Sequence, residues 1–149
     1  MVISLKKFRE IVLQMVYSRD LNDHSDSRAF LALLDHWVVP RSVLYQAYVK
    51  VDSLFNEIEA IDSFIERFSE GYAFKRISSV ERNILRLGVF EMLFEKKTPP
   101  KVSISEAVRL SQKFGTPEGG AFVNGVLDAI FQSRERGCHS ETELPVFNH

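Results

Sequence analysis

Histidine and cysteine, the side chains that most often bind a metal ion or act as a nucleophile, are few in this sequence and show no metal-binding spacing. The histidines are His24, His36, His139 and His149, and the single cysteine is Cys138. A zinc site needs four such ligands at short, paired spacings. A single cysteine also excludes an internal disulfide and is typical of a reducing compartment. We therefore expect neither a metal site nor a catalytic cysteine.

Phosphate binding and acid–base catalysis would need other patterns, and these are incomplete here. The segment GTPEGGAF (115–122) holds three glycines but lacks the Lys-Ser/Thr pair of a phosphate-binding loop. No GxSxG motif supplies a serine nucleophile. Glu57 and Glu59 are more typical of a solvated helix face than of a catalytic dyad. The sequence therefore predicts a protein that is not an enzyme and has no cofactor.

Charge alternates in blocks along the chain, although the net charge is only −1. Residues 1–19 carry +3 and residues 73–114 carry +5, whereas residues 20–72 carry −6 and residues 115–149 carry −3. If the two basic blocks share one face of the fold, that face would attract a polyanion such as nucleic acid. The alternative is a mosaic of solvated charges that averages out over the surface.

The segment FVNGVLD (122–128) carries two conflicting signals. Its Asn124-Gly125 pair between apolar residues favours a two-residue β-hairpin. The apolar residues around that pair instead recur at helical spacing. They are Phe122, Val123, Val126, Leu127, Ile130 and Phe131. We therefore predict a helix, in which Asn124 and Gly125 need a specific reason because both are mediocre helix formers.

Helical spacing of apolar residues extends over most of the chain. The first expected helices cover Leu5–Val16, Phe30–Val38 and Ser42 to about Phe68, the last long enough to be two helices with a bend. We expect a single all-α domain of six or seven helices over residues 1–133, followed by a flexible tail at 134–149. No apolar run approaches the roughly 18 residues of a membrane span, and no signal peptide is evident, so we expect a cytoplasmic protein.

Two capping-box spacings mark further helix starts. Ser78 and Glu81 precede a helix that is apolar on most sides, which is typical of a central helix. Ser103 and Glu106 repeat the spacing before a helix that Gly115 is expected to end.

Four segments, in this order, resemble the NusB family of bacterial transcription antitermination factors. They are FREIVLQMVYS (8–18), SSVERNILRLGVFEML (78–93), PPKVSISEAVRLSQKFG (99–115) and FVNGVLDAI (122–130). The resemblance implies an all-α fold of two helical sub-bundles. It also implies a factor that binds boxA-type single-stranded RNA together with NusE, a small-subunit ribosomal protein, in an RNA polymerase antitermination complex on rRNA operons. Some family members also form homodimers.

The resemblance assigns RNA contacts to residues from several parts of the chain. The family's arginine-rich patch at the first helix corresponds to Lys6, Lys7 and Arg9, and it is thinner here because Leu5 and Phe8 interrupt it. Each lost phosphate contact should weaken binding and its salt dependence. The other candidates from matching regions are Tyr17, Arg86, Glu118 and Phe122. For Tyr17 and Phe122, a place in the core is the competing interpretation.

Three further residues receive other roles. Glu81 falls where the family meets NusE, although its part in the capping box is an alternative explanation. We expect Asn124 and Gly125 to be structural. The Gly125 position would let another helix or the RNA backbone approach closely, and the Asn124 amide would satisfy a loop or helix end.

Three functional hypotheses follow. The first is an RNA-binding antitermination factor that works with NusE. The second is a helical protein-interaction module with weakened RNA binding, suggested by the thin basic patch and the acidic 20–72 block. The third and weakest is a fragment of an RNA-modifying enzyme, because the same domain precedes some rRNA methyltransferases.

Overall fold

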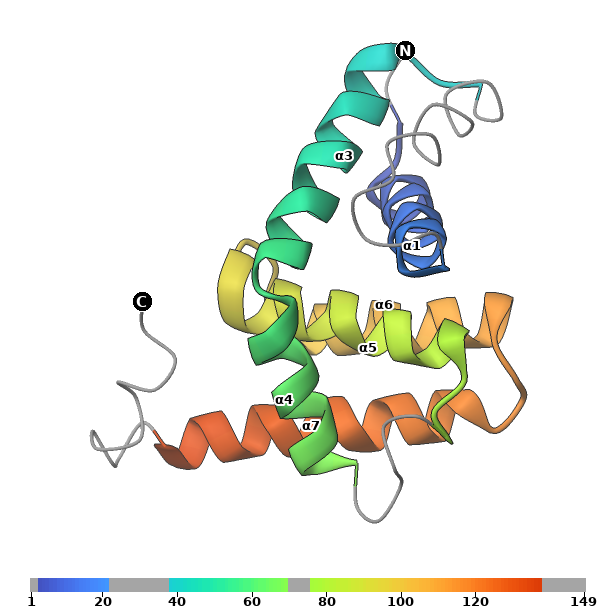
Figure 1. Ribbon diagram of the computed structural model, residues 1–149. Coiled ribbons are helices and arrows are strands. Elements are labelled where there is room, and N and C mark those ends of the chain that lie inside the picture. Colours follow the sequence, from blue (N-terminus) through green and yellow to red (C-terminus); the bar gives the residue numbers. More distant parts are fainter. Residues whose placement is uncertain (1–2, 22–37, 70–75, 138–149) are drawn as a thin grey trace. The chain divides into compact units, whose positions relative to one another are not determined.

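The computed structural model describes residues 3–21, 38–69 and 76–137 (Figure 1). Within these ranges the chain forms helices and no strands, which confirms the predicted all-α class. The chain divides into two compact units, Met1–Glu57 and Ile58–His149, in agreement with the expected two sub-bundles. No helix in the described ranges is long and apolar enough to cross a membrane. The four histidines, Cys138 and all of the expected second helix except Val38 lie outside the described residues.

The first unit consists of α1 (Leu5–Leu21) packed against α3 (Arg41–Asn56). The apolar positions that the two helices bury are Ile11, Val12, Leu13, Met15, Val16, Leu44, Ala47, Val51, Leu54 and Phe55. Near the end of α1, an Arg19 Nη2 atom lies 3.2 Å from Asp52 Oδ1, and the guanidinium lies 4.7 Å from the centre of the Phe55 ring. This ion pair and cation–π contact join the two helices.

The second unit holds α4 (Ile58–Phe68), α5 (Ser79–Val89), a π-helical turn η2 (Phe90–Glu95), α6 (Pro100–Phe114) and α7 (Gly119–Gly137). The predicted division of the 42–68 segment into two helices is confirmed, since α3 ends at Asn56 and α4 begins at Ile58. Helix α5 packs against α4, α6 and α7, and every residue from 83 to 92 is buried. The prediction of a central helix is therefore confirmed.

Close packing between α5 and α7 depends on Gly88. A Cβ atom placed on Gly88 would lie 2.7 Å from Leu127 Cδ1, closer than real Cβ contacts allow. Leu127 is fully buried and cannot move into solvent. Glycine at position 88 therefore lets the two helices approach each other.

The start of α6 differs from the prediction. The helix begins at Pro100, with Pro99 as its N-cap, so the expected capping box at Ser103 and Glu106 is wrong. Proline suits the first helical position because the amide hydrogen that it lacks would have no partner there. Ser103 instead lies inside the helix, where its hydroxyl donates to Glu91 Oε1 over 3.1 Å.

Helix α7 confirms the helical interpretation of the Asn124-Gly125 segment. It runs antiparallel to α6, and a short connection joins the two (Figure 1). It also continues to Gly137, so residues 134–137, which we expected in the tail, are helical.

Candidate nucleic-acid interface

A pocket of about 210 Å³ lies in the second unit, where the chain enters α5 and where α6 connects to α7. Its lining residues are Arg76, Ile77, Ser78, Glu81, Thr116, Glu118, Gly119 and Phe122. The structure thus brings together three residues singled out from the sequence, Glu81, Glu118 and Phe122. We call this the Phe122 pocket.

Glu81 connects the start of α5 to the α6–α7 connection. The N-cap prediction for Ser78 is confirmed, because its Oγ accepts a hydrogen bond of 3.2 Å from the Glu81 amide. The Ser78 hydroxyl in turn donates to Glu81 Oε1 over 2.6 Å. The other carboxylate oxygen, Oε2, accepts from the amide of Thr116 over 3.2 Å. With only 6% of its surface exposed, Glu81 has its carboxylate engaged on both sides by the protein itself.

Two glycines make room for this carboxylate. A Cβ atom on Gly119 would lie 2.8 Å from Glu81 Oε2, and a Cβ atom on Gly115 would collide with the same oxygen. Gly115 is the C-cap of α6, as predicted, but its φ of −101° is open to any residue. The glycines are therefore needed for space around Glu81 rather than for backbone conformation.

Phe122 and Glu118 face the solvent side of the pocket. Phe122 lies in the first turn of α7 and is half-buried, whereas Val123, Val126 and Leu127 of the same helix are fully in the core. Glu118 is exposed, and so is Arg76 across the pocket. The pocket therefore offers a half-exposed aromatic ring, one exposed cation and one exposed carboxylate.

Arg86 lies outside this pocket and is 4% exposed. Its Nε and Nη2 atoms each lie 2.8 Å from a carboxylate oxygen of Asp62. Its Nη1 atom donates to Asn83 Oδ1 over 2.9 Å. This bidentate pair joins α4 to α5, so the structure supports a structural role for Arg86.

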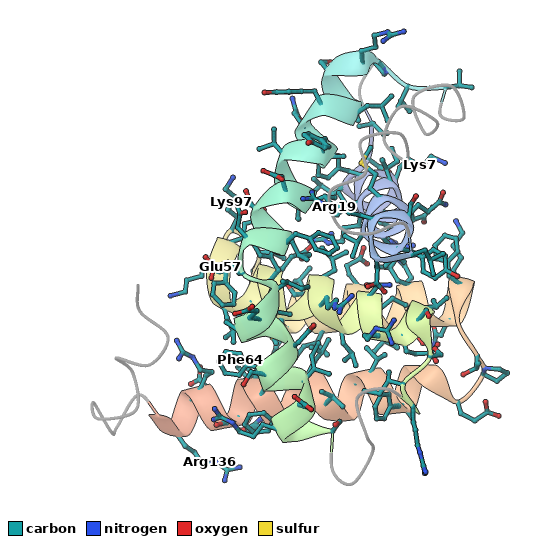
Figure 2. All side chains as sticks on the ribbon, viewed as in Figure 1. Lys7, Arg19, Glu57, Phe64, Lys97 and Arg136 are labelled. Carbon is teal, nitrogen blue, oxygen red and sulfur yellow. The ribbon has the colours of Figure 1, made fainter. Side chains whose placement is uncertain are left out.

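The remaining candidates lie on α1, in the first unit. Lys6 and Lys7 are exposed, and Lys7 extends outward from the helix, as Figure 2 shows. Arg9, in contrast, is 7% exposed, and Tyr17 is half-buried. The exposed part of the predicted basic patch therefore consists of Lys6 and Lys7.

Comparison with known proteins identifies a protein family whose model matches most of the chain. Residues 6–132 match the model of the NusB family. The chain belongs to the NusB family. This confirms the resemblance seen in the four sequence segments.

Named NusB proteins and solved NusB structures cover most of the chain. It is 33% identical over 127 residues to the transcription antitermination protein NusB of Desulfitobacterium hafniense (strain DSM 10664 / DCB-2), covering 84% of this chain and 86% of that one. A structure of T. maritima NusB is similar with a TM-score of 0.75 at 30% identity, over 87% of this chain and 92% of that chain. A chain from a crystal structure of antitermination factors NusB and NusE in complex with dsRNA gives a TM-score of 0.74 at 32% identity, covering 86% and 96%.

In this member of the NusB family, α7 differs from expectation at Gly125. A Cβ atom on Gly125 would meet no atom within 4 Å among the described residues, so none of the described helices packs closely there, and of the two expected neighbours the RNA backbone remains a prediction. Gly88 is the glycine that allows close helix packing. The Asn124 side chain is exposed, and no hydrogen bond from its amide is seen in the described ranges. The structural role expected for Asn124 finds no support in this part of the chain.

The sequence pattern missed two residues that line the Phe122 pocket and one that holds a candidate residue in place. Arg76 and Thr116 line the Phe122 pocket, and Asp62 holds Arg86. Asp62 and Arg86 are 24 positions apart on different helices, and no local spacing connects them. The position of Arg76 two residues before the N-cap Ser78 was the one available signal, since it placed a cation at a helix start.

Proposed function

We propose that this chain is a non-catalytic transcription antitermination factor that binds a boxA-type single-stranded RNA together with NusE during transcription of rRNA operons. The observation that carries the proposal is the Phe122 pocket on a member of the NusB family. Single-stranded RNA is recognised by bases that stack on aromatic rings and hydrogen-bond through their edges. A half-exposed phenylalanine beside a cation and a carboxylate suits that task.

The proposed contacts divide between the two units. The ring of Phe122 stacks on a base, Arg76 contacts a phosphate or base edge, and Glu118 accepts from a base amino group or a 2′-hydroxyl. On α1, Lys6 and Lys7 neutralise phosphates, with Tyr17 at the rim of the same surface. The two lysine contacts alone predict a shallow salt dependence, with a slope of about −1.4 in log affinity against log salt, and a phosphate contact from Arg76 would add about −0.7.

The buried candidates support the site indirectly. Arg86 holds α4 against α5, and the burial of Arg9 withholds its charge from the surface. Glu81 supports the NusE-facing surface by fixing Ser78 and Thr116, since a carboxylate that is 6% exposed offers little to a partner. We propose that NusE supplies the RNA affinity that the thin basic patch lacks, within the polymerase antitermination complex of the bacterial cytoplasm.

A titration of boxA-type RNA, with and without NusE, tests the proposal. Binding should be weak alone and stronger with NusE. Phe122→Leu should weaken it about fivefold or more through lost stacking. Phe131→Leu is the matched control, because Phe131 is also half-buried on α7 but does not line the pocket. Absence of RNA binding even with NusE present would overturn the proposal.

The second candidate is a protein-interaction module that has largely lost RNA binding. Two observations favour it: Arg9 is buried, and Leu5, beside the basic patch, is 74% exposed. The same titration separates the two candidates. Tight NusE binding with no RNA affinity would support this second function.

A further inference from the structure

The solvent-exposed side of α7 next to the Phe122 pocket includes small residues. At 3.6 residues per turn, the exposed residues follow one another around the helix in a continuous arc. Starting from Phe122, the arc contains Glu118, which directly precedes α7, and then Gly125, Ala121, Asp128 and Asn124, in that order, and all five are exposed. The small residues Gly125 and Ala121 therefore lie between Phe122 on one side of α7 and Asn124 on the other.

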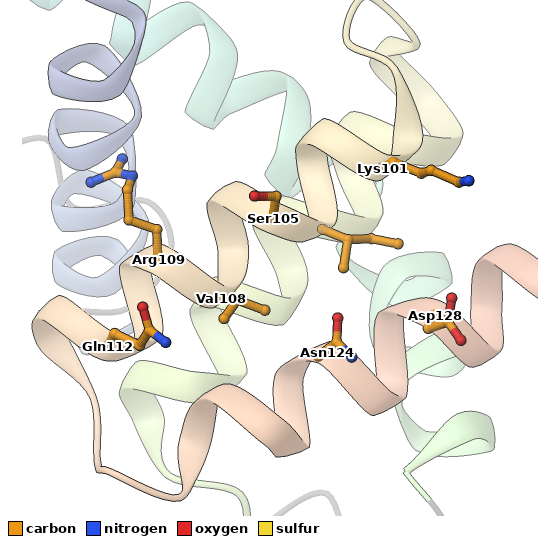
Figure 3. Close-up of a pocket in the computed structure, with 8 residues that line it drawn as sticks. Lys101, Ser105, Val108, Arg109, Gln112, Asn124 and Asp128 are labelled. Carbon is orange, nitrogen blue, oxygen red and sulfur yellow. The ribbon is translucent and has the colours of Figure 1, made fainter.

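Beyond this arc, α6 and α7 enclose a groove of about 530 Å³. Figure 3 shows Asn124 pointing from α7 toward α6, with Ser105, Val108 and Gln112 opposite. The complete lining is Lys101, Ile104, Ser105, Val108, Arg109, Gln112, Asn124 and Asp128. Ile104 is buried and Val108 half-buried, so the floor is apolar, whereas the walls carry amide, hydroxyl and charged groups. We call this the α6–α7 groove.

Two residues of α7 make no contact within the described ranges that would explain their identity. Gly125 costs helix stability relative to alanine, yet a Cβ atom there would meet nothing within 4 Å. The Asn124 amide shows no hydrogen bond in the described part of the chain. A ligand that passes closely over Gly125 and bonds the Asn124 amide would account for both.

We propose that the α6–α7 groove is a second nucleobase subsite. In this inference, which rests on the proposed RNA-binding function, a strand that leaves the Phe122 pocket crosses α7 over Ala121 and Gly125. The next base then lies on Ile104 and Val108. Its edge faces the amides of Asn124 and Gln112.

The chemistry of the groove favours RNA over a protein segment. A helix that docks in a groove needs a continuous apolar lining for its anchor residues, and here only the floor is apolar. An amide side chain presents a donor and an acceptor together, which matches the edge of a base, adenine above all. Asp128 accepts from an exocyclic amino group, which uracil lacks. The subsite should therefore prefer adenine to uracil.

Charge in the groove is balanced rather than strongly positive. Lys101 lies exposed in the first turn of α6, where it can approach a phosphate. The guanidinium of Arg109 is held by Glu106, with Nε and Nη2 each 3.1 Å from a carboxylate oxygen. Lys101 is therefore the cation that should add a salt-dependent contact when the strand is extended.

Binding of a short RNA that fills only the Phe122 pocket, compared with the same RNA extended by adenosine at either end, tests the inference. In the presence of NusE, one of the two extensions should strengthen binding about fivefold or more. The gain should be smaller with uridine. Asn124→Ala and Gly125→Leu should each abolish the gain without changing affinity for the short RNA.

Control variants separate the subsite from general effects. Lys101→Gln should reduce the gain, whereas Lys113→Gln should not, since both lysines are exposed on α6 but only Lys101 lines the groove. Gly125→Ala adds a single methyl group in open space and serves as a second variant if Gly125→Leu does not fold.

The outcomes distinguish this inference from the proposed function. If the short RNA does not bind wild-type protein with NusE, the proposed function fails. If the short RNA binds but extension gives no gain, or the gain survives Asn124→Ala and Gly125→Leu, the second subsite is overturned. Loss of NusE binding in these variants, with the RNA gain intact, would overturn it in favour of a protein-docking groove.

Discussion

Replacing Glu81 with alanine tests whether this residue acts as a connector inside the second unit. The change removes the carboxylate that accepts from Ser78 Oγ at 2.6 Å and from the Thr116 amide at 3.2 Å. Hydrogen bonds to a charged group contribute about 1.5–3 kcal/mol each. Water that enters through the adjoining pocket would satisfy part of the loss. We therefore expect the free energy of unfolding to fall by about 3 kcal/mol.

A loss of that size should lower the melting temperature by about 6–12 °C in a chain of this length. Thermal and urea unfolding followed by circular dichroism would measure it. Glu81→Gln keeps one carbonyl acceptor and should lose about half as much. Glu118→Ala is the control, because Glu118 lines the same pocket but is exposed, so it should stay within about 0.5 kcal/mol of wild type.

The refuting result is an unfolding curve of Glu81→Ala that coincides with that of wild type. A separate outcome bears on NusE. If Glu81→Gln unfolds close to wild type yet loses NusE binding, the carboxylate contacts the partner directly, and the supporting role proposed here is wrong.

Three further predictions use the same unfolding and RNA-binding assays. Gly88→Ala should lower the free energy of unfolding by about 1 kcal/mol through overpacking, whereas Gly125→Ala should raise it by about 0.5–1 kcal/mol. Urea unfolding that shifts the stability of both variants in the same direction would contradict this. Arg86→Ala should cost about 3 kcal/mol in the same assay, since it leaves Asp62 without its partner. Glu118→Gln should weaken RNA binding about twofold to fivefold, measured by fluorescence anisotropy, because it removes a charged hydrogen-bond acceptor. Tighter binding at low salt would instead show that the Glu118 carboxylate repels the RNA.

The fold could be predicted because apolar spacing is a property of the local sequence. At residues 122–128 that spacing outweighed the Asn-Gly hairpin signal, since a turn there would have exposed residues that α7 buries, such as Val123, Val126 and Leu127. Helix starts were less reliable. Ser78 and Ser103 show the same capping spacing, but Pro100 begins α6 three residues before Ser103. A proline at the first helical position was the stronger signal, and it was available in the sequence.

The candidate site could be predicted only in part, because its contacts join distant segments. The spacing of Ser78 and Glu81 revealed the cap, but the hydrogen bond that the Thr116 amide donates to Glu81 spans 35 positions. Arginine often contacts RNA, so the residue type of Arg86 suggested an RNA contact. Its pairing with Asp62 could not be predicted, because it depends on how α4 packs on α5. Residue type indicates what a side chain can bind, whereas burial decides whether a ligand can reach it.

The structure gives different reasons for the glycines at different positions. Gly88 is required by a neighbouring side chain, and Gly115 and Gly119 are required by a buried carboxylate. Gly125 has no such neighbour in the described part of the chain. Because a helix loses stability at an interior glycine, the proposed subsite supplies a physical reason for Gly125: a ligand that approaches the backbone from outside. If Gly125→Ala stabilises the protein and also loses the added affinity for an extended RNA, the helix stability lost at Gly125 serves binding. If the variant is more stable and keeps that added affinity, glycine at this position has no binding role.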